Sequence, residues 1–116
     1  MTVSVQFIEG LDEAIAGISL RKRRNDETKI VVLTFDRMRA IEQFRSLTQK
    51  IDALLLRDEE GEIRVIPSGI KFIFEKEDEL SKAFCTFEVN SESAFERVMR
   101  FLHRYAEANG FEFRDR

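Results

Sequence analysis

The residues best suited to chemistry are a single cysteine and a single histidine. Cys85 lies in an alternating apolar segment, residues 83–87, with no histidine near it in the sequence. A nucleophilic thiol needs a base or a helix N-terminus beside it, so we expect Cys85 to be a packed, buried thiol. His103 has no second histidine, and one cysteine cannot form an intramolecular disulfide or a zinc finger. The sequence therefore predicts neither an enzyme nor a metal site, and it indicates no cofactor.

Two acidic runs, residues 58–62 and residues 75–79, could pair carboxylates for glycoside hydrolysis or bind calcium. Neither run has the spacing of an EF-hand loop. Each run falls between two strand-like segments, and runs of charge usually face solvent. We therefore expect both to be solvated hairpin tips.

Basic residues form two candidate partner-binding patches. Nucleic-acid binding is not expected, because the chain has 19 basic and 22 acidic residues and a net charge of -3. Near an anionic membrane, each residue of a basic run contributes about 1 kcal/mol. The first patch is therefore either a solvated strand end or a surface that orients the protein on a negative partner. The candidate residues are Arg21, Lys22, Arg23 and Arg24 in the first patch, and Arg97, Arg100 and Arg104 on the polar side of a C-terminal helix.

The elements that position these residues are mostly strands. Alternation of apolar and polar residues, together with turn signals, predicts seven strands. One of them, residues 29–35, is apolar on both faces, so it must be central in the fold or covered by a partner. The predicted strands cover residues 3–7, 15–23, 29–35, 51–57, 62–66, 70–74 and 83–89.

Two helices are predicted. A short one covers residues 36–45, with Asp36 as its N-cap, because apolar residues there recur at a spacing of three. The second begins after Ser91 and ends at Gly110, with a continuous apolar stripe that faces a core. Residues 111–113 could add a short extended tail. The predicted fold class is α+β: a largely antiparallel β-sheet meander packed against the C-terminal amphipathic helix, plus one short helix, in a single domain over residues 1–116.

Three segments of the chain resemble a known family. They are residues 95–111, FERVMRFLHRYAEANGF; residues 55–63, LLRDEEGEI; and residues 5–10, VQFIEG. They are similar to the M-R-F-M-x-R-Y-A-x-E-N-G-L helix, the I-D-E-E-G-E-L hairpin and the I-Q-F-x-x-G opening of the Psb28 family of photosystem II assembly factors. Ala108 stands where a glutamate is common in the family, so two forms stay open, the main factor and a divergent second isoform.

The resemblance implies a non-catalytic protein without a cofactor, bound peripherally at the cytoplasmic side of the thylakoid membrane. Its implied partners are the reaction-centre and inner-antenna subunits of photosystem II in assembly or repair intermediates. We expect it to be a monomer that binds by sheet-edge pairing supplemented by charged contacts. The alternative is a small carrier or chaperone for chlorophyll or a precursor, with some of the eleven phenylalanines lining an apolar pocket.

Overall fold

The structure, a computed structural model, describes residues 3–23, 28–40, 53–75 and 80–110. All seven predicted strands are present, and within these residues there is one further strand, of two residues, that was not predicted. The elements are β1 (Ser4–Ile8), β2 (Leu11–Asp12), β3 (Gly17–Lys22), β4 (Lys29–Phe35), β5 (Leu54–Asp58), β6 (Gly61–Val65), β7 (Gly69–Phe74), β8 (Leu80–Val89) and α2 (Glu92–Asn109).

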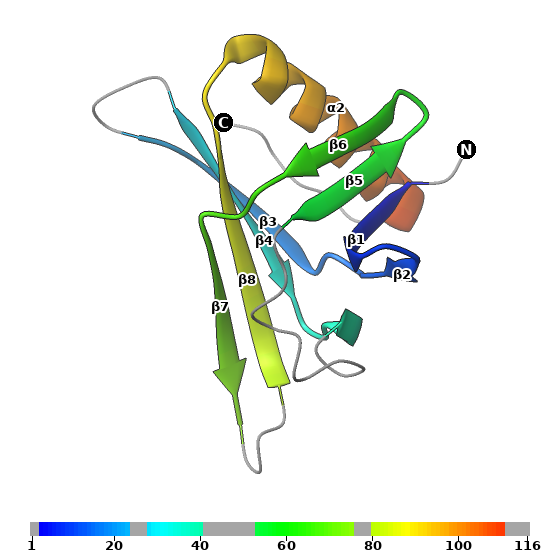
Figure 1. The fold of residues 1–116 in the computed structure, drawn as a ribbon, viewed down its shortest axis with the longest axis vertical. Coiled ribbons are helices and arrows are strands. Elements are labelled where there is room, and N and C mark those ends of the chain that lie inside the picture. Colours follow the sequence, from blue (N-terminus) through cyan, green and yellow to red (C-terminus); the bar gives the residue numbers. More distant parts are fainter. Residues whose placement is uncertain (1–2, 24–27, 41–52, 76–79, 111–116) are drawn as a thin grey trace.

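The strands form two four-stranded antiparallel sheets, which confirms the predicted α+β class. Their orders are β2-β1-β5-β6 in the first sheet and β3-β4-β8-β7 in the second (Figure 1). The strands thus do not follow one another as a simple meander, because β5 pairs with β1 and β8 pairs with β4. The chain passes from the first sheet to the second twice, at residues 13–16 and at residues 66–68. At the second passage, Pro67 lacks the N–H that a continuing strand would donate.

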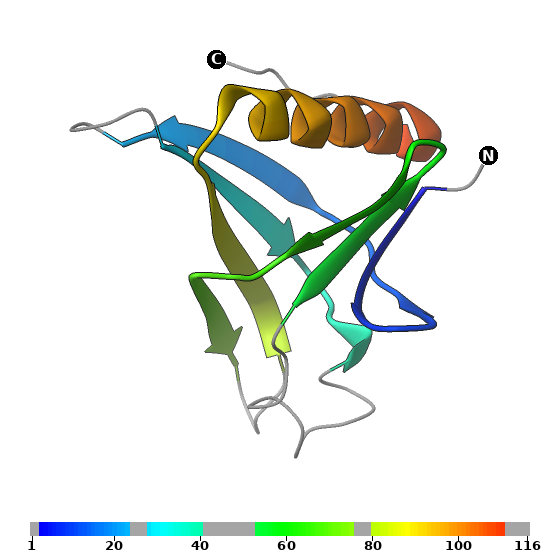
Figure 2. The same cartoon turned by 45° about the horizontal axis from the view of Figure 1, so that its top comes forward.

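The two sheets diverge from each other, and α2 lies across the wide end between them (Figure 2). The inward side chains of β4, which are Val31, Leu33 and Phe35, have no exposed surface. They share one hydrophobic core with residues of the first sheet and of α2, such as Leu56 and Phe101. The core therefore holds both sheets and the helix together.

The C-terminal helix begins and ends where the sequence predicts. The Ser91 hydroxyl accepts a hydrogen bond from the Ala94 N–H at 3.1 Å, as an N-cap does. Gly110 has a φ of 72°, and its N–H donates to the Ala106 carbonyl. On the buried face, the Tyr105 hydroxyl accepts a hydrogen bond from the Ile15 N–H at 2.9 Å. This contact joins α2 to the segment between β2 and β3.

The predicted short helix is capped by a residue other than the one expected. Residues 39 and 40 are helical, and the continuation at 41–45, like the predicted tail at 111–113, lies outside the described residues. The proposed N-cap, Asp36, is exposed and approaches Lys82 at 3.8 Å. The N–H groups of Arg39 and Ala40 instead donate to the two carboxylate oxygens of Glu13, at 2.8 and 2.9 Å. The Asp36 prediction is wrong because a buried carboxylate from a distant loop provides the cap.

Candidate functional site

The three helix arginines face the turn between β5 and β6. Their spacing of three and four residues places them along one side of α2. The side chains of Arg97 and Arg104 are only 20% and 29% exposed, and that of Arg100 is 49% exposed. The arginines thus lie on the polar side of α2, but the hairpin turn covers much of Arg97 and Arg104.

The arginines bind two carboxylates of that turn, and we call the five residues the arginine–carboxylate cluster. Arg97 donates to both oxygens of Asp58, at 2.7 and 2.9 Å. Arg104 donates from Nη1 to Asp58 at 2.9 Å and to Glu60 at 2.5 Å. Arg100 donates to both oxygens of Glu60, at 2.8 and 3.0 Å. The first acidic run is a hairpin tip, as predicted, and Glu59 is 51% exposed. The prediction that the run is solvated is wrong for Asp58, whose side chain has no exposed surface. Most of the second run, residues 76–79, lies outside the described residues.

The cluster changes the acidity of its carboxyl groups. Burial alone would raise the pKa of Asp58, but the hydrogen bonds from Arg97 and Arg104 outweigh it and lower that pKa to about 2. Hydrogen bonds from Arg100 and Arg104 likewise lower the pKa of Glu60 to about 2. Both carboxylates therefore stay ionised well below neutral pH, and the cluster holds α2 against the hairpin throughout the physiological range.

We expect the protein to lose stability on acidification through the cluster. A carboxylate whose pKa is lowered by folding contributes stability above its unfolded pKa, and that contribution is lost as the pH falls through its folded pKa. For Asp58 the window runs from about pH 4 to about pH 2, and its share is about 2 kcal/mol. Urea unfolding across this window should show a shallower loss in Asp58→Asn than in the unchanged protein. Equal slopes in the two proteins would contradict the assignment.

The first basic patch lies at the end of β3, an edge strand of the second sheet. Arg21 and Lys22 are exposed there. Arg23 forms an ion pair with Glu88 of β8, and Arg24 lies outside the described residues. The structure thus places two of the four residues in solvent and a third against the outer side of the sheet.

Among the described strands, neither sheet closes on itself, and the β7 edge carries exposed apolar residues. Strand β7 pairs with β8 on one side and is the last strand of its sheet. At its end, Ile73 is 40% exposed and Phe74 is 51% exposed. The rings of Phe72 and Phe74 lie 6.2 Å apart between centroids. A strand edge with unpaired backbone groups and exposed apolar side chains is the usual site at which an extended segment of a partner can pair.

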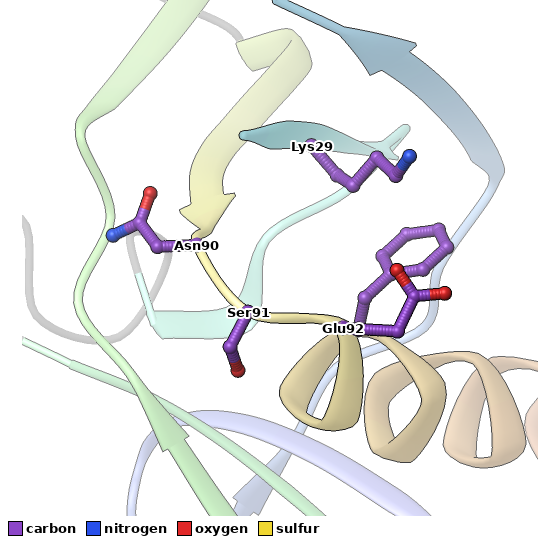
Figure 3. A pocket seen from close by; sticks show the side chains of 5 residues that line it. Lys29, Asn90, Ser91 and Glu92 are labelled. Atoms are coloured by element: carbon purple, nitrogen blue, oxygen red, sulfur yellow. The ribbon is translucent and has the colours of Figure 1, made fainter. Parts of the chain in front are cut away.

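A hollow of about 220 Å³ at the start of α2 is a candidate ligand site (Figure 3). Its lining includes Lys29 and Glu92, and the Lys29 ammonium lies 5.5 Å from the centre of the Phe95 ring. Ligand pockets usually measure about 300–1,000 Å³, so this hollow is small and has charged walls. Phe35 and Phe87, which could have lined a pigment pocket, have no exposed surface and lie in the core. The described part of the chain thus gives no support to the carrier alternative.

Cys85, the candidate nucleophile, is part of the hydrophobic core. Cys85 has no exposed surface, and burial raises the pKa of its thiol to about 12, which confirms the prediction of a packed thiol. Among the residues that the structure describes, no group of three or more histidine, cysteine or acidic side chains is placed to hold a metal ion. Within the same residues, no helix is both long and apolar enough to cross a membrane.

Comparison with known proteins decides the family. The family described as "Psb28 protein" matches residues 5–113. The chain belongs to the Psb28 family. A "Photosystem II reaction center Psb28 protein" from Cyanidioschyzon merolae is 33% identical over 111 residues, which are 95% of each chain. Proteins of the same name from Synechococcus elongatus and Acaryochloris marina are 31% and 28% identical over 114 residues, which are 97% of each chain.

Membership of the Psb28 family agrees with the prediction of a non-catalytic protein. Two of the segments that resemble the family contact each other in the structure. The hairpin segment supplies Asp58 and Glu60, and the helix segment supplies Arg97, Arg100 and Arg104. Two of the three Psb28-like segments are thus the two halves of the arginine–carboxylate cluster. The choice between the main form and a second isoform stays a prediction.

Proposed function

We propose that this protein is a non-catalytic accessory factor that transiently binds assembly or repair intermediates of photosystem II. Its partners would be the reaction-centre and inner-antenna subunits, and it would act as a peripheral monomer at the cytoplasmic side of the thylakoid membrane. The observation that carries the proposal is the match to the Psb28 family over residues 5–113, whose relatives are named as photosystem II reaction center proteins.

The open edge of β7 is the surface that best fits such binding. Five added backbone hydrogen bonds, at about 0.5–1.5 kcal/mol each, do not by themselves offset the association cost of about 4–15 kcal/mol. Burial of the exposed half of Phe74 adds about 2 kcal/mol at about 25 cal/mol per Å² of apolar surface. We propose β7 as the docking strand, because this edge offers both contributions.

Charge would supplement the edge. We propose that Arg21, Lys22, Arg23 and Arg24 attract an acidic or membrane-proximal surface, since two of them are exposed. The helix arginines are the weaker candidates for contact with a partner, because Arg97, Arg100 and Arg104 already bind Asp58 and Glu60. The attraction between the basic residues at the end of β3 and the partner would weaken as salt rises, because exposed charges are screened within about 10 Å at 0.1 M ionic strength.

The test is binding to photosystem II intermediates isolated from thylakoids, with Phe74→Ser as the variant. We expect affinity to fall at least tenfold, because the apolar surface that would be buried on the partner is lost while the fold, in which Phe74 is half exposed, is kept. Retention measured by pulldown and by titration would provide the comparison.

Ile66→Ser is the matched control. Ile66 is also an exposed apolar residue, at 73%, but it lies between β6 and β7 and outside the docking strand. Its replacement should leave the affinity within about twofold. Equal affinity of Phe74→Ser and the unchanged protein would remove β7 from the proposal, and no binding by the unchanged protein would overturn the proposed function itself.

A further inference from the structure

The outer face of the second sheet has no described element packed on it. In Figures 1 and 2, α2 and the first sheet lie on the other side of β3, β4, β7 and β8. The residues of β4 that alternate with its buried ones, Ile30 and Val32, point to this outer face and are half-buried. The core thus accounts for the apolar residues on one face of β4, and Ile30 and Val32 on its other face have no such explanation.

Register places the outer residues in rows across the sheet. Ile30 lies between Arg21 and Glu88, and Val32 lies between Ser19 and Thr86. In the next rows, Phe84 of β8 lies beside Lys71, and Ile73 of β7 lies beside Lys82. The apolar side chain lies on β4 in the first two rows, on β8 in the third and on β7 in the fourth, so the four form an oblique stripe. The outer stripe, as we call it, consists of Ile30, Val32, Phe84 and Ile73.

Positive charge surrounds the outer stripe. Arg21, Lys71 and Lys82 belong to its rows, and Arg23 reaches it through the ion pair with Glu88. Among the described residues, the acidic side chains that contact these basic groups are Glu88, which pairs with Arg23, and Asp36, which approaches Lys82 at 3.8 Å. In the described part of this face, basic groups thus outnumber acidic ones, whereas the whole chain carries a net charge of -3. The face is complementary to a partner that is both apolar and acidic.

We propose that the outer stripe docks an amphipathic helical segment of a photosystem II protein whose apolar side is flanked by aspartate and glutamate. The inference rests on the proposed function, because it names a second contact with the same partner complex. Four rows spaced by two residues extend over about 20 Å, and a helix spans this length with about 13–15 residues. Helices commonly pack on sheet faces, so a partner helix could bind here if its apolar side matches the outer stripe.

A protein segment fits this face better than a lipid surface does. Interfacial binding to lipid requires apolar side chains that reach about 5–10 Å into the boundary of the acyl chains. Val32, Ile30 and Phe84 sit on central strands and are half-buried by their neighbours, which include the long Arg21 and Lys71 side chains. A partner side chain can fill the spaces between them, whereas a bilayer would meet the basic groups first.

The test uses two variants of the outer face and isolated photosystem II intermediates as the probe. Val32→Thr/Phe84→Thr removes apolar surface and keeps good strand formers. Arg21→Glu/Lys82→Glu reverses charge at exposed positions and leaves the core untouched. We expect each variant to bind at least tenfold more weakly, with the loss in the charge variant shrinking as salt is raised. Arg64→Glu, at an exposed position on the first sheet, is the control and should bind normally.

A photo-crosslinking residue at Ser19, which is exposed on the outer face, identifies the occupant. Cross-links to an acidic amphipathic segment, mapped by mass spectrometry, would support the proposal. Cross-links to a basic segment would overturn it. Normal binding by both variants while Phe74→Ser binds weakly would overturn the outer stripe alone, and failure of the unchanged protein to bind would overturn both proposals.

Two further outcomes overturn the proposal by naming another occupant. Flotation with galactolipid vesicles, with and without phosphatidylglycerol, should show no binding that depends on the outer stripe. Light scattering should give the same mass for the unchanged protein and for Val32→Thr/Phe84→Thr. Stripe-dependent flotation would make the occupant a membrane, and a mass that falls in the variant would make it a second copy of this chain.

Discussion

Replacing Asp58 with alanine should lower the free energy of unfolding by about 3 kcal/mol. The Asp58 side chain has no exposed surface and accepts hydrogen bonds from Arg97 and Arg104. Removing one partner of a buried ion pair leaves the other charge uncompensated, which costs about 3–5 kcal/mol, and the partial exposure of the arginines places this case at the lower end. Urea denaturation followed by circular dichroism would measure the change.

Glu59→Ala is the control for this prediction. Glu59 lies in the same turn, is 51% exposed and approaches Arg104 only at 3.9 Å, so its removal should change the stability by less than about 0.5 kcal/mol. Combining Asp58→Ala with Arg97→Met should cost less than the sum of the two single changes, because the second removes a charge that the first leaves unpaired. Additive costs, or a loss in Asp58→Ala as small as that in Glu59→Ala, would show that the cluster is not the source of the stability.

Replacing Glu13 with alanine should lower the free energy of unfolding by about 2–3 kcal/mol. Glu13 is 5% exposed, and its carboxylate accepts the N–H groups of Arg39 and Ala40. A buried donor left without its acceptor costs about 1–3 kcal/mol, and hydrogen bonds to a charged group are the stronger kind. The variant should also exchange the amide hydrogens of residues 39 and 40 faster than the unchanged protein does.

The matched control for Glu13 is Glu9→Ala. Glu9 lies in the turn after β1, and its side chain is 78% exposed while it forms an ion pair with Arg57 at 3.2 Å. Exposed pairs contribute about 0.2–1 kcal/mol, so this change should have a small effect. If both variants unfold at the same urea concentration, the carboxylate of Glu13 does not hold the segment after β4.

Local periodicity was enough to predict most elements. The strand β4 and the helix α2 have strong patterns over seven and eighteen residues, and the caps Ser91 and Gly110 use local hydrogen bonds that the sequence itself places. The two-residue strand β2 was missed because two residues carry no period. The division into two sheets was missed because the pairing of β1 with β5 joins residues far apart in the chain, which alternation cannot reveal.

The difference between local patterns and long-range contacts also explains how much of the site could be predicted. The residue types of the arginine–carboxylate cluster were visible in the sequence, and so was the spacing of Arg97, Arg100 and Arg104 along one side of a helix. Their contact with the hairpin was not predicted, because the amphipathic pattern separates apolar from polar sides but does not say which polar residues meet another element. Glu13 carried no signal at all, since a cap supplied by a residue 26 positions away depends on tertiary structure.

The position of α2 across the wide end of the two sheets bears on how the protein is made. The contact between Ile15 and Tyr105 joins residues 90 positions apart, and β1 must wait for β5 to form its main pairing. Since α2 follows all eight strands along the chain, the ribosome releases it after them, and the apolar surfaces of both sheets stay unprotected until it is synthesised. Such dependence on distant contacts slows folding and favours aggregation before completion. A nascent chain stalled before α2 should therefore recruit chaperones that a full-length chain releases.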